Sequence, residues 1–119
     1  MGNFVPTGSF TKTTKNPITT LFCQSQKRDQ SWIGAGMDLT ALSAANVENL
    51  DGFLVNHPDG TQSGYVPGGS YAKTSRNMQV ILAASAQKRD QSWQMSTLDI
   101  TSLPIGKTVS NIDGVLTVD

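Results

Sequence analysis

The stretch Gln26-Lys27-Arg28-Asp29-Gln30-Ser31-Trp32 occurs again, letter for letter, at residues 87–93. The two copies lie 61 positions apart, and single residues such as Gly8 and Gly69 match at the same spacing. After one residue of slippage, residues 49–52 match residues 111–114. The chain of 119 residues therefore holds two related units. Two copies are too few for a solenoid, so we expect a closed pseudo-symmetric pair.

Each unit shows the pattern of short strands and turns. Residues 18–23 and 79–84 are apolar or β-branched runs bounded by polar residues, which predicts strands. The Lys-Arg-Asp-Gln stretch after each run predicts a hairpin tip, which is either a solvated end or the rim of a pocket. Asp51-Gly52 and Asp113-Gly114 predict tight turns, because this dipeptide supplies positive φ angles. The sequence thus predicts an all-β fold.

Two short segments and four aromatic residues complete this pattern. Residues 38–42 and 99–103 predict short 3-10 turns with an Asp or Thr cap. Trp32 and Trp93 begin the returning strands, and their large apolar area indicates the core of each lobe, with sugar stacking as the alternative. Phe10 and Tyr71 are likewise expected in the core.

Composition argues against several classes of protein. The formal net charge is zero, so the basic excess of a nucleic-acid binder is missing and we expect no nucleic-acid partner. No apolar stretch reaches the length of a membrane span, so we expect no membrane insertion. Residues 1–6 lack the regions of a signal peptide, which favours a cytoplasmic chain or one released without a conventional leader. Cys23 is the only cysteine, so no disulfide can form within the chain.

Three segments together resemble the family of cyanovirin-N homologues: Gly8–Thr13, Val47–Gly52 and Val109–Leu116. The Asn-hydrophobic-Asp-Gly motif that closes each unit is the most specific part of the likeness. The resemblance implies a cyanovirin-N-like, pseudo-symmetric tandem repeat in which each lobe takes strands from the other repeat. It divides one domain of residues 1–119 into repeat 1 (about 1–55), a linker (about 56–68), repeat 2 (about 69–119), lobe A (about 1–45 with 106–119) and lobe B (about 46–105).

The resemblance also implies a function. Members of this family are lectins that bind the α1,2-linked mannose termini of high-mannose glycans. The expected partners are such oligosaccharides and glycoproteins that bear them, and an antiviral effect would follow from binding viral glycoproteins. Carried over residue by residue, carbohydrate-binding site A comprises Ser9, Lys12, Thr13, Gln24, Gln26, Asn111, Ile112 and Asp113. Site B comprises Glu48, Asn49, Asp51, Ser70, Lys73, Thr74, Arg89 and Gln91.

The residue types in these two sets suit sugar recognition. Each sugar hydroxyl both donates and accepts; Asp, Glu and Asn accept from it, and Lys and Arg donate to it. Such a site needs no cofactor, no metal and no catalytic residue, and we expect none. Glu48 has Ser110 as its counterpart in the other unit, so the two sites are expected to differ in affinity.

Two alternatives belong to other classes. A glycoside hydrolase needs two carboxylates across a pocket, and Glu48 with Asp51 is the best pair. The matching pair in the second unit is Ser110 with Asp113, so that unit lacks one of the two carboxylates, and we expect no enzyme. The second alternative is a degenerate family member that acts as a protein-interaction module without binding sugar. The Gly-rich linker favours a monomer over a strand-exchanged dimer.

Overall fold

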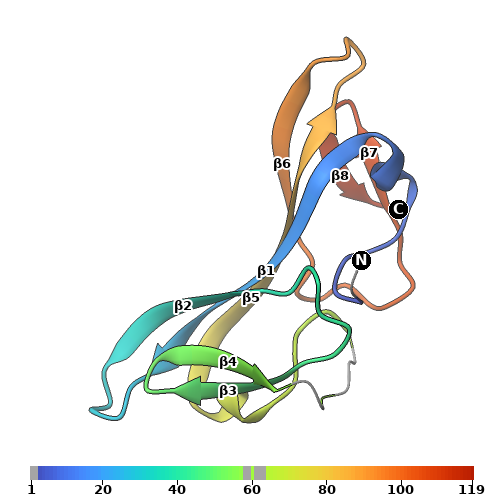
Figure 1. Cartoon of the computed structure of the whole chain (residues 1–119). Coiled ribbons are helices and arrows are strands. Elements are labelled where there is room, and N and C mark those ends of the chain that lie inside the picture. The colour runs from blue at the N-terminus through green and yellow to red at the C-terminus, as the bar shows by residue number, and fades with distance from the viewer. Residues whose placement is uncertain (1–2, 58–59, 61–63) are drawn as a thin grey trace.

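A computed structural model describes residues 3–57, 60 and 64–119. The protein is all-β, with antiparallel sheets and two short 3-10 turns (Figure 1). In chain order the elements are η1 (Ser9–Lys12), β1 (Thr14–Gln26), β2 (Trp32–Asp38), β3 (Asn46–Leu50), β4 (Phe53–His57), η2 (Ser70–Lys73), β5 (Ser75–Gln87), β6 (Trp93–Asp99), β7 (Val109–Ile112) and β8 (Val115–Val118).

A four-stranded sheet in the order β2-β1-β5-β6 runs the length of the molecule (Figure 1). Its centre is the antiparallel pair β1–β5, with Thr14 opposite Ala86 at one end and Ser25 opposite Ser75 at the other. Each of these strands has 13 residues, so each spans about 40 Å at the usual rise of about 3.3 Å per residue. The molecule is accordingly elongated, with extents of 52 × 26 × 20 Å.

A two-stranded hairpin packs near each end of this sheet (Figure 1). The β3–β4 hairpin contacts η2 and β2, and the β7–β8 hairpin contacts η1 and β6. The two tight turns are confirmed, since Asp51 and Gly52 have φ of 50° and 96°, and Asp113 and Gly114 have 49° and 88°. Each hairpin therefore lies beside the β-strand that immediately precedes it in the chain and beside one 3-10 turn: η2, the next element in the chain, for β3–β4, and η1, near the N-terminus, for β7–β8.

This packing differs from the predicted lobes. The prediction grouped residues 1–45 with 106–119, but β2 packs with β4 and β6 with β8. The reason is the length of β1, which runs through the middle of the molecule and so separates η1 from β2. The structure groups η1 and the start of β1 with β6, β7 and β8, and it groups the end of β1 with β2, β3 and β4.

The core lies under one face of the sheet. Thr19, Leu21, Cys23 and Ser25 are buried in alternation along β1, while the side chain of Phe22 is exposed on the other face. This alternation follows from the two-residue period of a strand. The same face of β5 adds four residues to the core, and it packs against Phe10 and Tyr71, which are fully buried as predicted: the four are Val80, Leu82, Ala84 and Ala86.

The prediction for the two tryptophans is wrong. Trp32 and Trp93 are 37% and 43% exposed. Trp32 pairs with Gln26 across the β1–β2 ladder, a register that puts its ring on the outer face with Gln24 and Phe22. There the guanidinium carbon of Arg76 lies 4.0 Å from the centre of the Trp32 ring, and Lys15 Nζ lies 4.2 Å from that of Trp93.

The 3-10 turns also lie elsewhere than predicted. They occupy residues 9–12 and 70–73, whereas residues 38–42 and 99–103 form single hydrogen-bonded turns. The expected cap is present there, because Asp38 accepts from the backbone N–H of Thr40 and Asp99 accepts from that of Thr101. Each of these two segments therefore forms one capped turn, as the sequence predicts, but not a 3-10 element.

Part of the predicted linker, residues 58–59 and 61–63, lies outside the described residues. Among the residues that are described, no helix has the length and apolar character needed to cross a bilayer.

Candidate functional site

The turn of the β3–β4 hairpin is fastened to the ends of β1 and η2 by one side-chain amide. Asn49 Nδ2 donates to the backbone oxygen of Gln26 at 2.9 Å and to Thr74 Oγ1 at 2.9 Å. Asn49 Oδ1 accepts the backbone N–H of Gly52 at 2.8 Å. The amide is fully engaged in these bonds, so the role of Asn49 in this structure is to hold the turn in place.

The β7–β8 hairpin has the same set of bonds. Asn111 Nδ2 donates to the backbone oxygen of Gln87 at 2.9 Å and to Thr13 Oγ1 at 2.9 Å. Asn111 Oδ1 accepts the backbone N–H of Gly114 at 2.8 Å. Two turns at opposite ends of the long sheet therefore have the same local geometry.

The aspartate of each turn reaches across to the hairpin tip of the sheet. Asp51 Oδ1 accepts the backbone N–H of Arg28 at 2.9 Å, and Asp113 Oδ1 accepts that of Arg89 at 2.9 Å. In the part of the chain that is described, no donor meets the second oxygen of either carboxylate. Each turn thus holds a carboxylate in a fixed direction with one oxygen open to a ligand.

A shallow depression lies at each of these turns. We call them the Asn49 depression and the Asn111 depression. Their volumes of about 350 and 310 Å³ fall at the small end of the roughly 300–1,000 Å³ range of ligand sites. The Asn49 depression is lined by Gln26, Lys27, Arg28, Glu48, Asn49, Leu50, Asp51 and Thr74. The Asn111 depression is lined by Thr13, Gln87, Lys88, Arg89, Asn111, Ile112 and Asp113.

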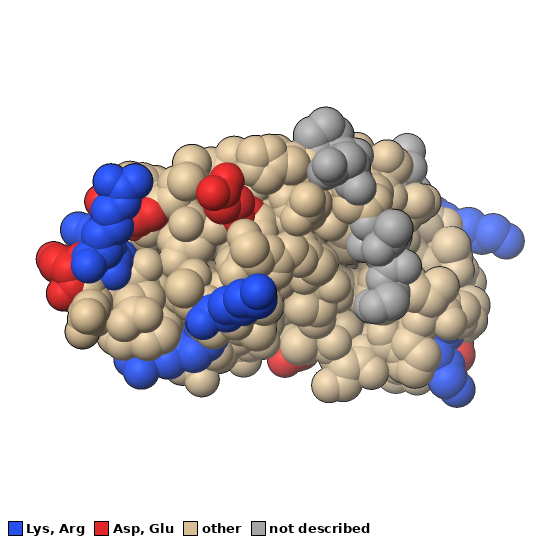
Figure 2. All heavy atoms as spheres, turned by 90° about the horizontal axis from the view of Figure 1, so that it is seen from below, with Lys and Arg blue, Asp and Glu red and all other residues tan. Residues whose placement is uncertain are grey.

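Both depressions combine cationic and anionic side chains. Figure 2 shows the face that includes the tip of the β1–β2 hairpin, where Lys and Arg lie beside Asp and Glu at one end and most of the remaining surface is uncharged. Lys27, Arg28 and Asp51 line the depression near this tip. A site with both signs of charge offers donors and acceptors without attracting a strongly charged ligand.

One position distinguishes the two depressions. Glu48 Oε1 lies 2.9 Å from His57 Nε2, and both side chains are about half exposed. The corresponding position in the second hairpin is Ser110, whose hydroxyl donates to Asp119 Oδ1. The Asn49 depression therefore has a second carboxylate that the Asn111 depression lacks.

The structure brings half of the predicted site residues to the expected depression. From predicted site A these are Thr13, Asn111, Ile112 and Asp113, and from predicted site B they are Glu48, Asn49, Asp51 and Thr74. Ser9, Lys12, Ser70 and Lys73 lie on the two 3-10 turns and do not line either depression. Ser9 Oγ instead lies 3.3 Å from Ser110 Oγ.

The other four predicted residues lie at the opposite end from the one expected. Gln26 lines the Asn49 depression, and Arg89 lines the Asn111 depression. Gln24 lies near Gln26, where its Oε1 accepts from Arg76 at 2.9 Å, and Gln91 lies in the same turn as Arg89. The prediction placed Thr13 and Gln26 in one site, but they flank the two ends of the 13-residue strand β1.

Two lining residues, Leu50 and Gln87, were not predicted; three others, Lys27, Arg28 and Lys88, belong to the hairpin tips, for which a pocket rim was the alternative to a solvated turn. The duplicated heptapeptide was the available signal, because both of its copies begin with the Gln-Lys-Arg that lines a depression. Each Gln-Lys-Arg also belongs to the same unit as the Asn-hydrophobic-Asp-Gly turn that it faces.

Within residues 3–57, 60 and 64–119, no three His, Cys, Asp or Glu side chains are placed to hold a metal ion. No protein-family model matches the sequence, and no curated protein matches it.

Proposed function

We propose that this chain is a carbohydrate-binding protein that recognises α1,2-linked mannose termini through the Asn49 and Asn111 depressions. The observation that carries the proposal is that the two depressions have the same set of hydrogen bonds. The same amide, the same carboxylate and the same backbone N–H recur at both ends of the molecule. Both turns resemble those of cyanovirin-N homologues, and this resemblance is the reason for proposing mannose as the ligand.

The chemistry of each depression fits a neutral sugar. The open oxygen of Asp113 accepts from one hydroxyl, and the guanidinium or ammonium of Arg89 or Lys88 donates to its neighbour. Ile112 is 51% exposed and gives the apolar C–H side of the ring a surface to rest on. Two adjacent hydroxyls on one mannose thus meet one acceptor and one donor.

The finer architecture is part of the same proposal. We infer a pseudo-symmetric pair of repeats in which each repeat sends its 3-10 turn to the other repeat's hairpin. Contacts of η1 with β7 and of η2 with β3 support this form of exchange. The exchanged part is then the beginning of each repeat, rather than the hairpin at its end.

An NMR titration of ¹⁵N-labelled protein with α1,2-linked dimannose tests the function. We expect chemical-shift changes at residues 49–52 with Thr74, and at residues 111–114 with Thr13. Asp113→Asn is the matched variant, because an amide keeps the oxygen that accepts from Arg89 but loses the negative charge. It should abolish the changes at residues 111–114 and leave those at 49–52 in place.

Two outcomes would contradict the proposal. Absence of shift changes at millimolar dimannose would leave the fold without the proposed ligand. Shift changes confined to residues outside both depressions would assign sugar binding to another place.

The alternative of a protein-interaction module has one observation in its favour. The outer face of the sheet carries large apolar side chains that nothing described covers, among them Phe22 at 49% exposure and Met95 at 69%. A chain that binds no mannoside but associates through this face would support that alternative.

A further inference from the structure

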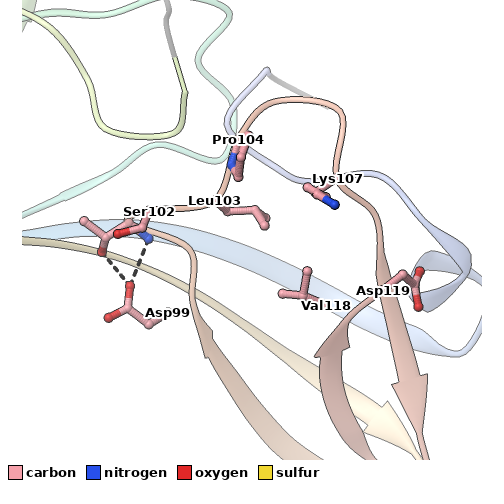
Figure 3. A pocket seen from close by; sticks show the side chains of 8 residues that line it. Asp99, Ser102, Leu103, Pro104, Lys107, Val118 and Asp119 are labelled. Atoms are coloured by element: carbon pink, nitrogen blue, oxygen red, sulfur yellow. Dashed lines mark hydrogen bonds between the residues drawn. The ribbon is translucent and has the colours of Figure 1, made fainter.

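A third depression, larger than the two at the hairpin turns, lies between the turn after β6 and the end of β8 (Figure 3). Its volume is about 390 Å³. It is lined by Asp99, Thr101, Ser102, Leu103, Pro104, Lys107, Val118 and Asp119. The proposed function uses none of these residues. We call it the Lys107 depression.

Its two carboxylates are held in fixed directions. Asp99 Oδ1 accepts from the backbone N–H of Thr101 at 2.9 Å and from the Thr101 hydroxyl at 2.5 Å. Asp119 accepts the hydroxyls of Ser110 and Thr108 through its two oxygens. The Thr101 hydroxyl lowers the pKa of Asp99, and the Ser110 hydroxyl lowers that of Asp119, so both groups are ionised at neutral pH.

Lys107 lines the same depression without neutralising either carboxylate. Within the described residues the only ion pair joins Glu48 and His57. Figure 3 shows Lys107 on the side of the depression opposite Val118, with Asp99 and Asp119 at its two ends. The ammonium of Lys107 and the carboxylates of Asp99 and Asp119 therefore line the depression from different sides, and the space between them stays open.

The floor of this space is apolar. Leu103 and Val118 lie between the charged groups in Figure 3, and Pro104 forms one edge. Rigid carboxylates, a mobile donor and an apolar strip form an arrangement that matches a pyranose, which has hydroxyls at its rim and C–H bonds on its face. The site carries one negative charge in total, which disfavours phosphate and acidic ligands.

Two lining residues of the Lys107 depression have no like residue at the matching positions of the first unit. Ala41 stands where the second half has Ser102, and neither residue 45 nor residue 46 is a lysine. Asn3 also donates from Nδ2 to the backbone oxygen of Ser43 at 2.8 Å, whereas the residue 61 positions after Asn3 is Gly64. The lining of the Lys107 depression is therefore not repeated residue for residue in the first unit.

Resting on the proposed function, we propose that the Lys107 depression is a third saccharide site, which binds one neutral hexose through Asp99, Ser102 and Lys107. A branched glycan would then meet unequal ends of the protein. Among the depressions that the described residues form, one lies at the Asn49 turn, and the Asn111 and Lys107 depressions lie at the other end.

The test is a titration of the labelled full chain with methyl α-mannopyranoside and, separately, with α1,2-linked dimannose. A ligand of about a dozen heavy atoms is expected to bind in the millimolar range, on the order of 1 mM. We expect the monosaccharide to shift residues 99–104, 107 and 118–119. Lys107→Met should weaken this response by about tenfold or more, because a charge-assisted hydrogen bond is lost. Lys107→Arg should restore it.

Asp113→Asn separates the two proposals. It should remove the response at residues 111–114 and leave that at residues 99–107 unchanged, while Lys107→Met should do the reverse. Shifts at the two hairpin depressions with none around Lys107 would overturn the third site and keep the lectin proposal. Shifts around Lys107 that are equal in wild type and Lys107→Met would also overturn it. No shift anywhere would overturn both.

Discussion

At the scale of single residues, one buried hydroxyl has no hydrogen-bond partner in the described structure. Thr19 is fully buried in β1, and its Oγ1 has no hydrogen-bond partner in the described structure. Its counterpart 61 positions later is Val80, which is also fully buried. Burying a hydroxyl without a partner costs about 1–3 kcal/mol, so the first unit carries a cost that the second avoids.

Thr19→Val should therefore stabilise the protein. The change keeps the shape of the side chain and leaves the backbone bonds of residue 19 to Thr40 and Leu39 intact. We expect the free energy of unfolding in urea to rise by about 1 kcal/mol. Thr20→Val on the other face is the control and should change it by less than about 0.5 kcal/mol. Equal effects at both positions would contradict the explanation.

Asn111 and Asp113 have different roles in the same turn: Asn111 holds the turn in place, and Asp113 is proposed to bind the ligand. Substitutions can separate these roles. Asn111→Ala removes the amide that joins the hairpin to Gln87 and Thr13, so we expect a loss of about 1–3 kcal/mol in stability together with a loss of sugar binding. Asp113→Asn should reduce binding with little loss of stability. Urea unfolding followed by the dimannose titration measures both effects. Normal stability of Asn111→Ala would show that the amide is not what fixes the turn.

At the scale of elements, two glycines allow the 3-10 turns to reach the hairpins. A Cβ on Gly69 would lie 2.3 Å from the backbone of Val47 in β3, and a Cβ on Gly8 would lie 2.2 Å from that of Val109 in β7. Their φ angles of 132° and 140° are also ones that other residues rarely adopt. The close approach of each turn to its hairpin thus depends on glycine.

Gly69→Ala should destabilise the protein by about 3 kcal/mol or more, since the added Cβ would clash with the backbone of Val47, which cannot move aside as a side chain can. Gly34→Ala is the matched control, because a Cβ there meets no atom within 4 Å and the backbone is extended. Its effect on thermal unfolding should be small. A Gly69→Ala protein as stable as the control would show that η2 and β3 can move apart freely.

The sequence was sufficient to predict the central strands and the tight turns, but not the 3-10 turns or which elements lie together. Residues 18–23 were recognised as a strand because their pattern is local. The strand in fact begins at Thr14, because β5 pairs with Thr14 and Lys15 and again from Ile18 onward, on both sides of a register shift at Asn16, whose φ is 55°, and Pro17. Such a partner some sixty residues away leaves no local pattern. The assignment of Gln26 and Arg89 to the wrong depressions has the same cause.

At the scale of the whole molecule, five aspartates share one electrostatic arrangement. A hydroxyl from a nearby residue holds the pKa of each below its usual value: Ser31 for Asp29, Thr40 for Asp38, Ser92 for Asp90, Thr101 for Asp99 and Ser110 for Asp119. A carboxyl whose pKa is lower in the folded state contributes stability above its unfolded pKa. That contribution is lost as the pH falls through the folded value.

Stability should accordingly be nearly constant from pH 7 down to about 5 and should fall below about pH 4, where unfolded aspartates begin to take up protons. Urea unfolding at several pH values measures this curve. Replacing Asp38 and Asp99 together with Asn should flatten its acidic limb. A maximum of stability below pH 4 would contradict the sign of these shifts.

The register of the central strands also bears on ancestry. Thr20 of β1 lies opposite Ile81 of β5, and the two are 61 positions apart, the spacing of the duplicated heptapeptide. A strand that faces its own counterpart is how two identical chains pair about a two-fold axis. Under the repeat architecture proposed above, a half-length ancestor is expected to have been a homodimer. A synthetic chain of residues 1–57 should sediment as that dimer, and a folded monomer would refute this history.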